Sequence, residues 1–354
     1  MKKAFSKHFL RLLVVAVFVC GLFWTTFVQA VTIVEYLTPT PNSSPADLAF
    51  DDKGHLWFTE INTNKIGRLD PFTAKPGTSE GIVEYDLPQK NSKPSYIIVA
   101  KDGIVWFSEM AGRIGRLDPA TGKIKEYDVP TPKSEPHHLA EAADGSIWFL
   151  EFEGNKIARL EPTSGSIEEF PVGEGHPHDL VLDGENIWYT KGGKFWAQEF
   201  FNKIGWFDIK TREVSEVSVP PKKSVPHGMA LAGDGGVWFS QLFAGKITRL
   251  DTAKNPPALI EYEIPGKRKG PHDLIVDSKR GWVWFVDNRG DNIGRLDLSK
   301  AKPGTTEGME MFKIPTPKAH PSELVLDKEG NVWFTEMGHY FRGRFQSKIG
   351  KLVP

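Results

Sequence analysis

A tract built around one tryptophan and the aromatic residue after it recurs along the chain and constrains the fold more than any other feature. It reads LWFTEINTNKIGRLD from Leu56, VWFSEMAGRIGRLD from Val105 and IWFLEFEGNKIARLE from Ile147, and looser copies follow. Successive copies lie 40 to 50 residues apart, a period typical of propeller blades and solenoid repeats. The seven repeated tryptophans are Trp57, Trp106, Trp148, Trp188, Trp238, Trp284 and Trp333.

Each repeat carries four strand signals separated by turn residues. In the first repeat, an apolar strand at 47–50 precedes a turn at 52–54, and the Trp-Phe strand comes next. The Ile-Gly-Arg-Leu segment is the third strand. A fourth at 82–85 ends before Pro88, because proline cannot continue a hydrogen-bonded ladder. Four short strands repeated radially predict an all-β fold, a seven-bladed β-propeller with four-stranded antiparallel blades.

The two ends of the chain complement each other. The seventh repeat reaches its third strand at 348–352 and stops at Pro354 without a fourth strand. Residues 33–37 (Ile-Val-Glu-Tyr-Leu) have the pattern of a fourth strand and precede the first repeat. Pairing this segment with the last blade would remove two exposed sheet edges. We therefore expect one propeller over residues 31–354, with its ring closed by the N-terminal strand.

Residues 1–30 have the composition of an export signal. Lys2, Lys3, Lys7 and Arg11 precede a long apolar stretch, which ends in Val28-Gln29-Ala30. This order is typical of a cleaved secretory signal peptide, and an uncleaved membrane anchor is the alternative. The only cysteine, Cys20, lies inside this segment, so the mature chain would have no disulfide. The expected protein is exported, periplasmic or secreted, with no membrane span after cleavage.

Charge and motifs exclude several classes of function. The net charge is −1, so there is no electrostatic footprint for nucleic acid. The sequence has no nucleophile elbow, phosphate-binding loop, zincin helix or cysteine-based metal motif. We expect a monomer whose partner is a small-molecule or cyclic peptide ligand at the mouth of the central channel.

Two repeated positions should meet at one rim of that channel. The start of the first strand and the end of the second lie at the same end of a blade, because these strands are antiparallel neighbours. The positions after the repeat proline are Ala46, Ser95, His137, His178, His227, His272 and Ser322. The positions three residues past the repeat tryptophan are Glu60, Glu109, Glu151, Lys191, Gln241, Asp287 and Glu336.

Imidazoles and carboxylates around one funnel can bind a divalent cation or perform acid–base chemistry. The alternative is structural, because consensus residues of a repeat often cap strands or bond the adjacent blade. The structural alternative suits the glutamates, which recur around the ring. The histidines occur in four consecutive blades only, which favours a functional role for them. Long aromatic loops at 191–201 and 338–345 fall on the same face. They indicate a rim for an apolar or ring-bearing ligand, or else loops that pack on their neighbours.

The repeat WFTE…NKIGRL, with Pro-His before it and a Glu-Tyr strand after it, resembles the virginiamycin B lyase (streptogramin lyase) family over the whole mature chain. This resemblance implies elimination by a histidine base, with Mg²⁺ as cofactor, to open a cyclic depsipeptide. The family motif Glu-Pro-His, with a glutamate fourteen residues after the histidine, occurs in the third repeat. It implies His137 as the catalytic base and Glu135 and Glu151 as metal ligands. From their positions around the channel, we expect His178, His227 and His272 to contact substrate.

One alternative site and two alternative functions remain possible from the sequence. A competing cluster in the fifth and sixth repeats contains His227, His272 and Asp287 but lacks the glutamate before the proline. A metal-dependent lactonase-type hydrolase would use the same groups on the same ester. A non-catalytic ligand- or protein-binding propeller of the cell envelope would use the aromatic loops without a metal.

Overall fold

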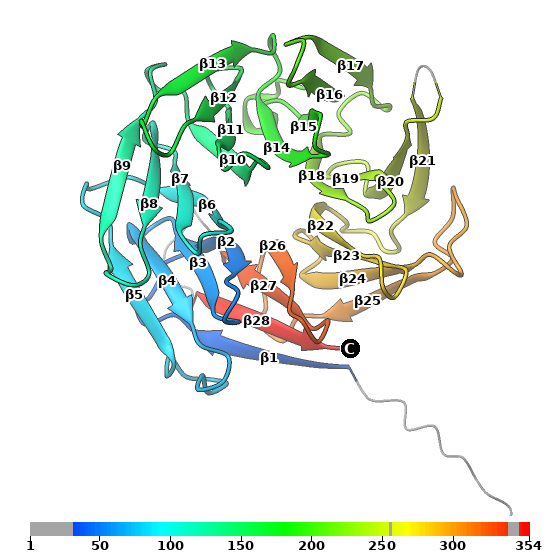
Figure 1. Ribbon diagram of the computed structural model, residues 1–354. Helices are drawn as coiled ribbons and strands as arrows, with labels where there is room; N and C mark the ends of the chain where they lie inside the picture. The colour runs from blue at the N-terminus through cyan, green and yellow to red at the C-terminus, as the bar shows by residue number, and fades with distance from the viewer. Residues whose placement is uncertain (1–30, 255–256, 339–346) are drawn as a thin grey trace, which may run out of the picture. The chain divides into compact units, whose positions relative to one another are not determined.

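The computed structural model describes residues 31–254, 257–338 and 347–354, and Val31–Pro354 form one compact unit. The expected signal peptide at 1–30 lies outside the described residues. Seven four-stranded antiparallel sheets surround a central axis like the blades of a propeller (Figure 1). The predicted fold class is therefore confirmed. Among the described residues there is no helix with the length and apolar character needed to span a membrane.

Each blade runs outward from its first strand. Blade 1 contains β2 (Pro45–Phe50), β3 (Leu56–Glu60), β4 (Lys65–Leu69) and β5 (Ile82–Asp86). Blade 2 contains β6 (Pro94–Val99), β7 (Val105–Glu109), β8 (Arg113–Leu117) and β9 (Ile124–Asp128). Blade 3 contains β10 (Pro136–Glu141), β11 (Ile147–Glu151), β12 (Lys156–Leu160) and β13 (Ile167–Pro171). Blade 4 contains β14 (Pro177–Leu182), β15 (Asn186–Lys191), β16 (Lys203–Asp208) and β17 (Val214–Ser218).

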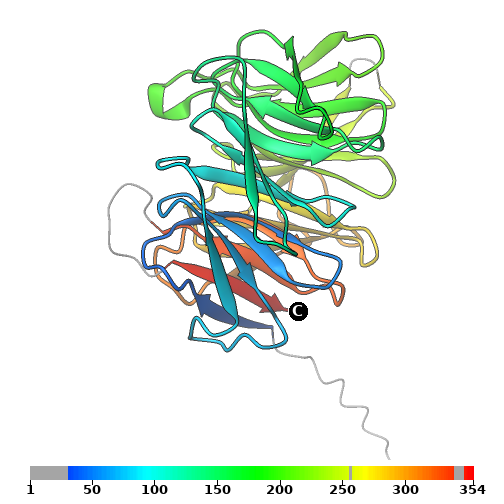
Figure 2. The same cartoon turned by 60° about the vertical axis from the view of Figure 1, so that its left-hand side comes forward.

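The remaining three blades follow the same order. Blade 5 contains β18 (Pro226–Leu231), β19 (Val237–Gln241), β20 (Lys246–Asp251) and β21 (Ala258–Glu263). Blade 6 contains β22 (Pro271–Asp277), β23 (Trp282–Asp287), β24 (Asn292–Asp297) and β25 (Met309–Lys313). Blade 7 contains β26 (Pro321–Leu326), β27 (Val332–Glu336), β28 (Lys348–Val353) and β1 (Thr32–Leu37). Within the described part of the chain, the one helical turn is η1 (Phe195–Ala197), which projects from blade 4 (Figure 2).

The N-terminal strand closes the ring, as predicted. β1 pairs with β28 along its whole length, from Thr32 opposite Val353 to Leu37 opposite Lys348. The Tyr36 ring stacks on the buried ring of Trp333, with 5.5 Å between centroids. The Lys348 ammonium lies 2.5 Å from a Glu35 carboxylate oxygen. The two ends of the chain are therefore held by backbone ladder, aromatic packing and an ion pair together.

The repeat consensus is explained by packing within and between blades. Trp57 and Phe58 are fully buried, and Trp57 packs in a cluster with Val105 and Phe107 of the next blade. Phe58 lies directly on Gly67 of the third strand, where an added Cβ would come 2.1 Å from the ring. The small residue in Ile-Gly-Arg-Leu is thus required by the aromatic residue beside it.

A β-bulge at the inner strand of every blade positions the candidate site. In blade 3, Pro136 pairs with Glu151 and Leu139 with Phe149, so the two residues between them on the inner strand oppose only Leu150. The same shift follows the proline of the other six blades. A bulge of this kind leaves extra residues outside the regular ladder and re-aims their side chains. The two residues after each proline therefore stand at the inner edge of the ring.

Candidate functional site at the channel mouth

The residues after the repeat prolines bring four histidines into one row. The ring centroids of His137 and His178 lie 4.9 Å apart. Those of His178 and His227, and of His227 and His272, each lie 3.8 Å apart. We call these four side chains the histidine row. It spans blades 3 to 6, one histidine from the start of each inner strand.

Burial keeps the histidine row uncharged at neutral pH. Loss of water lowers the pKa of His137 to about 3 and that of His272 to about 4. Burial, reinforced by the neighbouring imidazoles, also holds the pKa of His178 and His227 well below the usual value. A neutral imidazole has the free lone pair that a general base needs.

The four imidazoles differ in what orients them. His272 Nδ1 lies 2.9 Å from the Ser322 carbonyl oxygen, so this nitrogen carries the hydrogen and donates it. Its Nε2 therefore holds the lone pair. His137 Nδ1 is buried and has no hydrogen-bond partner among the described residues, while its ring stacks on Phe152 at 4.6 Å. Because an effective base is held in one tautomer by a third group, His272 is the better-prepared base of these two.

A second ring of side chains at the bulge was not predicted. It is formed by the residues two past each proline: Asp47, Tyr96, His138, Asp179, Gly228, Asp273 and Glu323. Asp179 accepts hydrogen bonds from the Leu180 N–H (2.6 Å) and from the Met229 N–H of the next blade (2.8 Å). Asp47 does the same with Leu48 (2.7 Å) and Ile97 (2.8 Å). These carboxylates latch one blade to the next; the recurring Pro-X-Asp was the signal for them.

Burial also reduces the negative charge on the channel wall. It raises the pKa of Asp47 to about 6 and that of Asp179 to about 7. It places the pKa of Asp273 and Glu323 well above the usual carboxyl range, since these two carboxyl groups also lie beside each other. At neutral pH Asp273 and Glu323 are therefore protonated and Asp179 is partly protonated, whereas Asp47 stays mostly ionised beside the neutral imidazoles.

The glutamates three residues past the tryptophans face the interior of their own blades. Burial, together with Glu169 of the same blade, raises the pKa of Glu151 to about 8. Burial does the same for Glu60 and Glu336, beside Glu84 and Glu35 respectively, and their pKa is also about 8. Both carboxylate oxygens of Glu151 lack a hydrogen-bond partner among the described residues, and so do both of Glu336. The unpartnered oxygens are thus a property of the repeat, shared by blades without a histidine.

The residues expected to bind a metal do not form a common ligand set. Burial raises the pKa of Glu135 and the neighbouring Glu153 adds to that shift, while Lys93 and Lys194 oppose it. The competing Asp287 accepts from the N–H groups of Gly270 (2.7 Å) and Gly290 (3.2 Å) and from the Asn292 amide (3.1 Å). Over residues 31–254, 257–338 and 347–354, no three His, Cys, Asp or Glu side chains converge to hold a metal ion. We therefore assign no reaction step to a metal.

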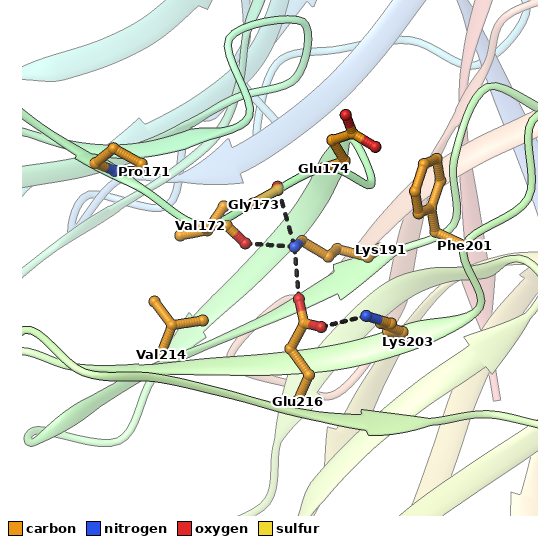
Figure 3. A pocket seen from close by; sticks show the side chains of 9 residues that line it. All are labelled: Pro171, Val172, Gly173, Glu174, Lys191, Phe201, Lys203, Val214 and Glu216. Carbon is orange, nitrogen blue, oxygen red and sulfur yellow. Dashed lines mark hydrogen bonds and ion pairs between the residues drawn. The ribbon is translucent and has the colours of Figure 1, made fainter.

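Blade 4 replaces the glutamate by a buried lysine. Lys191 Nζ donates to the Val172 carbonyl (2.5 Å), the Gly173 carbonyl (3.1 Å) and Glu216 (2.6 Å), as Figure 3 shows. Burial lowers the pKa of this ammonium and Glu216 opposes the shift. All three ammonium hydrogens are therefore engaged in hydrogen bonds within the protein. Lys191 lines an open cleft of about 660 Å³. Lys191 is thus a structural cation, not a nucleophile.

The aromatic loop of blade 4 continues the histidine row toward solvent. Phe152 lies against His137 on one side and stacks with Trp196 on the other, at 5.7 Å and 22°. Trp196 belongs to η1 and is 62% exposed. A stack of three aromatic rings therefore leads from the row to the rim. Of the second predicted loop, residues 339–345 lie outside the described residues.

Comparison with known proteins agrees with this architecture. The Virginiamycin B lyase family model matches residues 27–205 and 192–341. A virginiamycin B lyase from Nocardia farcinica is 26% identical over 187 residues, which is 51% of this chain and 55% of that protein. The chain thus matches about half the length of this curated relative.

Solved structures match over nearly the whole chain. A streptogramin B lyase structure superposes with a TM-score of 0.76 at 27% identity, covering 91% of this chain and 97% of that one. A catalytically inactive histidine-to-alanine variant of virginiamycin B lyase from Staphylococcus aureus, with quinupristin, gives 0.76 at 28% identity, covering 92% and 100%. Together with the repeats, these matches show that the chain belongs to the virginiamycin B lyase family.

Proposed function

We propose that this protein is an exported lyase that opens a cyclic ester or depsipeptide by elimination, with a histidine of the row as base. The observation that carries the proposal is His272, whose Nδ1–H is held by the Ser322 carbonyl while its Nε2 keeps a lone pair. Family membership supports the reaction class, since a relative is described as inactive when one histidine is changed to alanine.

In this proposal the proton moves from carbon to nitrogen as the ring opens. His272 Nε2 takes a proton from a carbon next to a carbonyl, and the released electron pair forms a carbon–carbon double bond. The ester C–O bond on the adjacent carbon breaks, and its electrons leave with the oxygen as a carboxylate. The imidazolium is stabilised by the Ser322 carbonyl, which accepts the Nδ1–H, and Glu323 Oε1 lies 3.4 Å from the same nitrogen. His137, His178 and His227 contact the substrate along the row.

A binding-only propeller is the second candidate. It is favoured by the pKa of about 3 for His137 and about 4 for His272, because a base with so low a pKa accepts protons weakly. Under this alternative the row and the aromatic stack would hold a ligand without changing it.

Mass spectrometry separates these functions. The purified protein is incubated with a streptogramin B antibiotic, with added Mg²⁺ and separately with EDTA, which measures any metal dependence. Elimination gives a linear product of unchanged mass, recognised by its fragmentation, whereas a lactonase adds one water. Recovery of the intact cyclic compound under both conditions would reject the lyase proposal for this substrate. Fractionation of the producing cells tests export.

A further inference from the structure

An open cleft of about 770 Å³ lies between the segment that follows η1 and the turn after β17. We call it the rim cleft. Its apolar wall includes Phe200 and Phe201, and its cationic wall Lys222 and Lys223. The other side chains that line it are neutral, and no carboxylate is among them.

The positive charge of the rim cleft is not neutralised within the protein. Lys223 Nζ lies 5.1 Å from the centroid of the Phe200 ring. In the part of the chain that the structure describes, neither Lys222 nor Lys223 forms an ion pair. Nearby lysines differ: Lys194 pairs with Glu153 at 2.5 Å, and Lys203 with Glu216 at 2.5 Å. The adjacent cleft around His176 is lined by Glu153, Glu174 and Glu199.

The aromatic and cationic pattern continues across the next two blades. The Phe200 ring lies 6.3 Å from that of Phe243, which is 39% exposed. The Arg289 guanidinium carbon lies 5.5 Å from the Phe243 centroid, and this arginine forms no ion pair with any described residue. Arg289 can pack there because its side chain fills the space where Gly270 has no Cβ.

Ring contacts connect the rim cleft to the histidine row. Phe201 lies 6.1 Å from His176, His176 lies 5.0 Å from Phe152, and Phe152 lies 4.6 Å from His137. The cleft and the row are therefore joined by consecutive ring contacts, and the cleft lies next to η1, which projects from the ring (Figure 2). A ligand in the cleft would lie beside the channel mouth and not inside it.

We propose that the rim cleft is a binding site for an anionic compound that carries an aromatic ring. The ring packs against Phe200 and Phe201, where an aromatic surface is already partly exposed. The anionic group, a carboxylate, sulfonate or phosphate, pairs with Lys222 and Lys223, which form no ion pair with a described residue. A cleft with one apolar wall and a few convergent polar groups is the usual form of a small-molecule site. This site goes beyond the elimination proposed above and does not depend on it.

The test uses 8-anilinonaphthalene-1-sulfonate, an anionic aromatic probe, and its uncharged analogue N-phenyl-1-naphthylamine, both titrated by fluorescence. We expect Lys222→Gln with Lys223→Gln to weaken binding of the sulfonate by about tenfold, because two charge-assisted contacts are lost. Binding of the uncharged probe should be unchanged. The matched control is Lys53→Gln, in a cleft with Phe50 and Phe72 where Asp51, Asp327 and Glu329 balance the charge.

Three results would overturn the proposal: wild-type affinity for the sulfonate in the double variant, equal loss of both probes, or an equal effect of Lys53→Gln. Circular dichroism checks the fold, and the single variant Lys222→Gln, expected to lose about threefold, replaces the double variant if that is unstable. Probe binding involves no turnover. A protein that binds the sulfonate but leaves the antibiotic intact would therefore keep this site and reject only the lyase proposal.

Discussion

The two halves of the ring share one backbone but differ in what stands at its inner edge. Blades 3 to 6 place a histidine after the proline, whereas blades 7, 1 and 2 place Ser322, Ala46 and Ser95 there. The bulge is the same in both halves, and so is the aspartate latch, made by Asp47 in one half and by Asp179 in the other. The fold therefore does not require imidazoles at this position, which supports a functional role for the histidine row.

The half without histidines carries the closure of the ring, and removing residues 31–38 should have the largest effect. Blade 7 would lose its fourth strand, the stacking of Tyr36 on Trp333 and the ion pair of Lys348 with Glu35. We expect the melting temperature to fall by about 10 °C or more, measured by circular dichroism. A synthetic peptide of residues 31–38, added to the shortened protein, should restore part of the loss. An unchanged melting temperature would show that closure contributes little.

The half with histidines carries the proposed chemistry, and His272→Ala should lower the rate of elimination by about 10² to 10⁴, as loss of a general base does. His137→Ala should mainly raise KM, because His137 is assigned a substrate contact. Ser95→Ala is the control from the other half and should leave the rate unchanged. If His137→Ala abolishes turnover while His272→Ala does not, the base is the residue that the Glu-Pro-His motif implies.

The sequence allowed the seven blades, the closing strand and the histidine row to be predicted, because a repeat with fixed spacing determines register. The prolines and tryptophans gave the strand ends, and antiparallel pairing placed Pro136 opposite Glu151. Spacing alone does not say which side of a sheet a residue faces. The bulge turns His137 toward the channel, while Glu151 packs with Glu169 inside its blade.

The second ring at the bulge was missed for a different reason. Asp47, Asp179 and Asp273 occupy equivalent positions, but Tyr96 and Gly228 break the pattern in other blades. The recurring Pro-X-Asp marks the positions, but the role of the aspartates is seen only in the N–H groups that they accept from, such as that of Met229, which donates to Asp179 at 2.8 Å. The bulge that exposes these N–H groups is determined by how the blades pack, so it cannot be predicted from the residue type at one position.

The smallest predicted effect compares one glutamate from each half. Burial raises the pKa of Glu151 and Glu60 in the folded protein to about 8, above the ordinary value of 4.5. Their contribution to stability is therefore complete below pH 4.5 and is lost as the pH rises to 8. Glutamine cannot ionise, so Glu151→Gln and Glu60→Gln should each raise the melting temperature by about 2 °C at pH 8 and leave it unchanged at pH 4.5.

A metal ligand would behave differently: Mg²⁺ would then stabilise the wild type and Glu60→Gln but not Glu151→Gln. Equal responses in both variants would assign Glu151 to the repeat and not to a metal site.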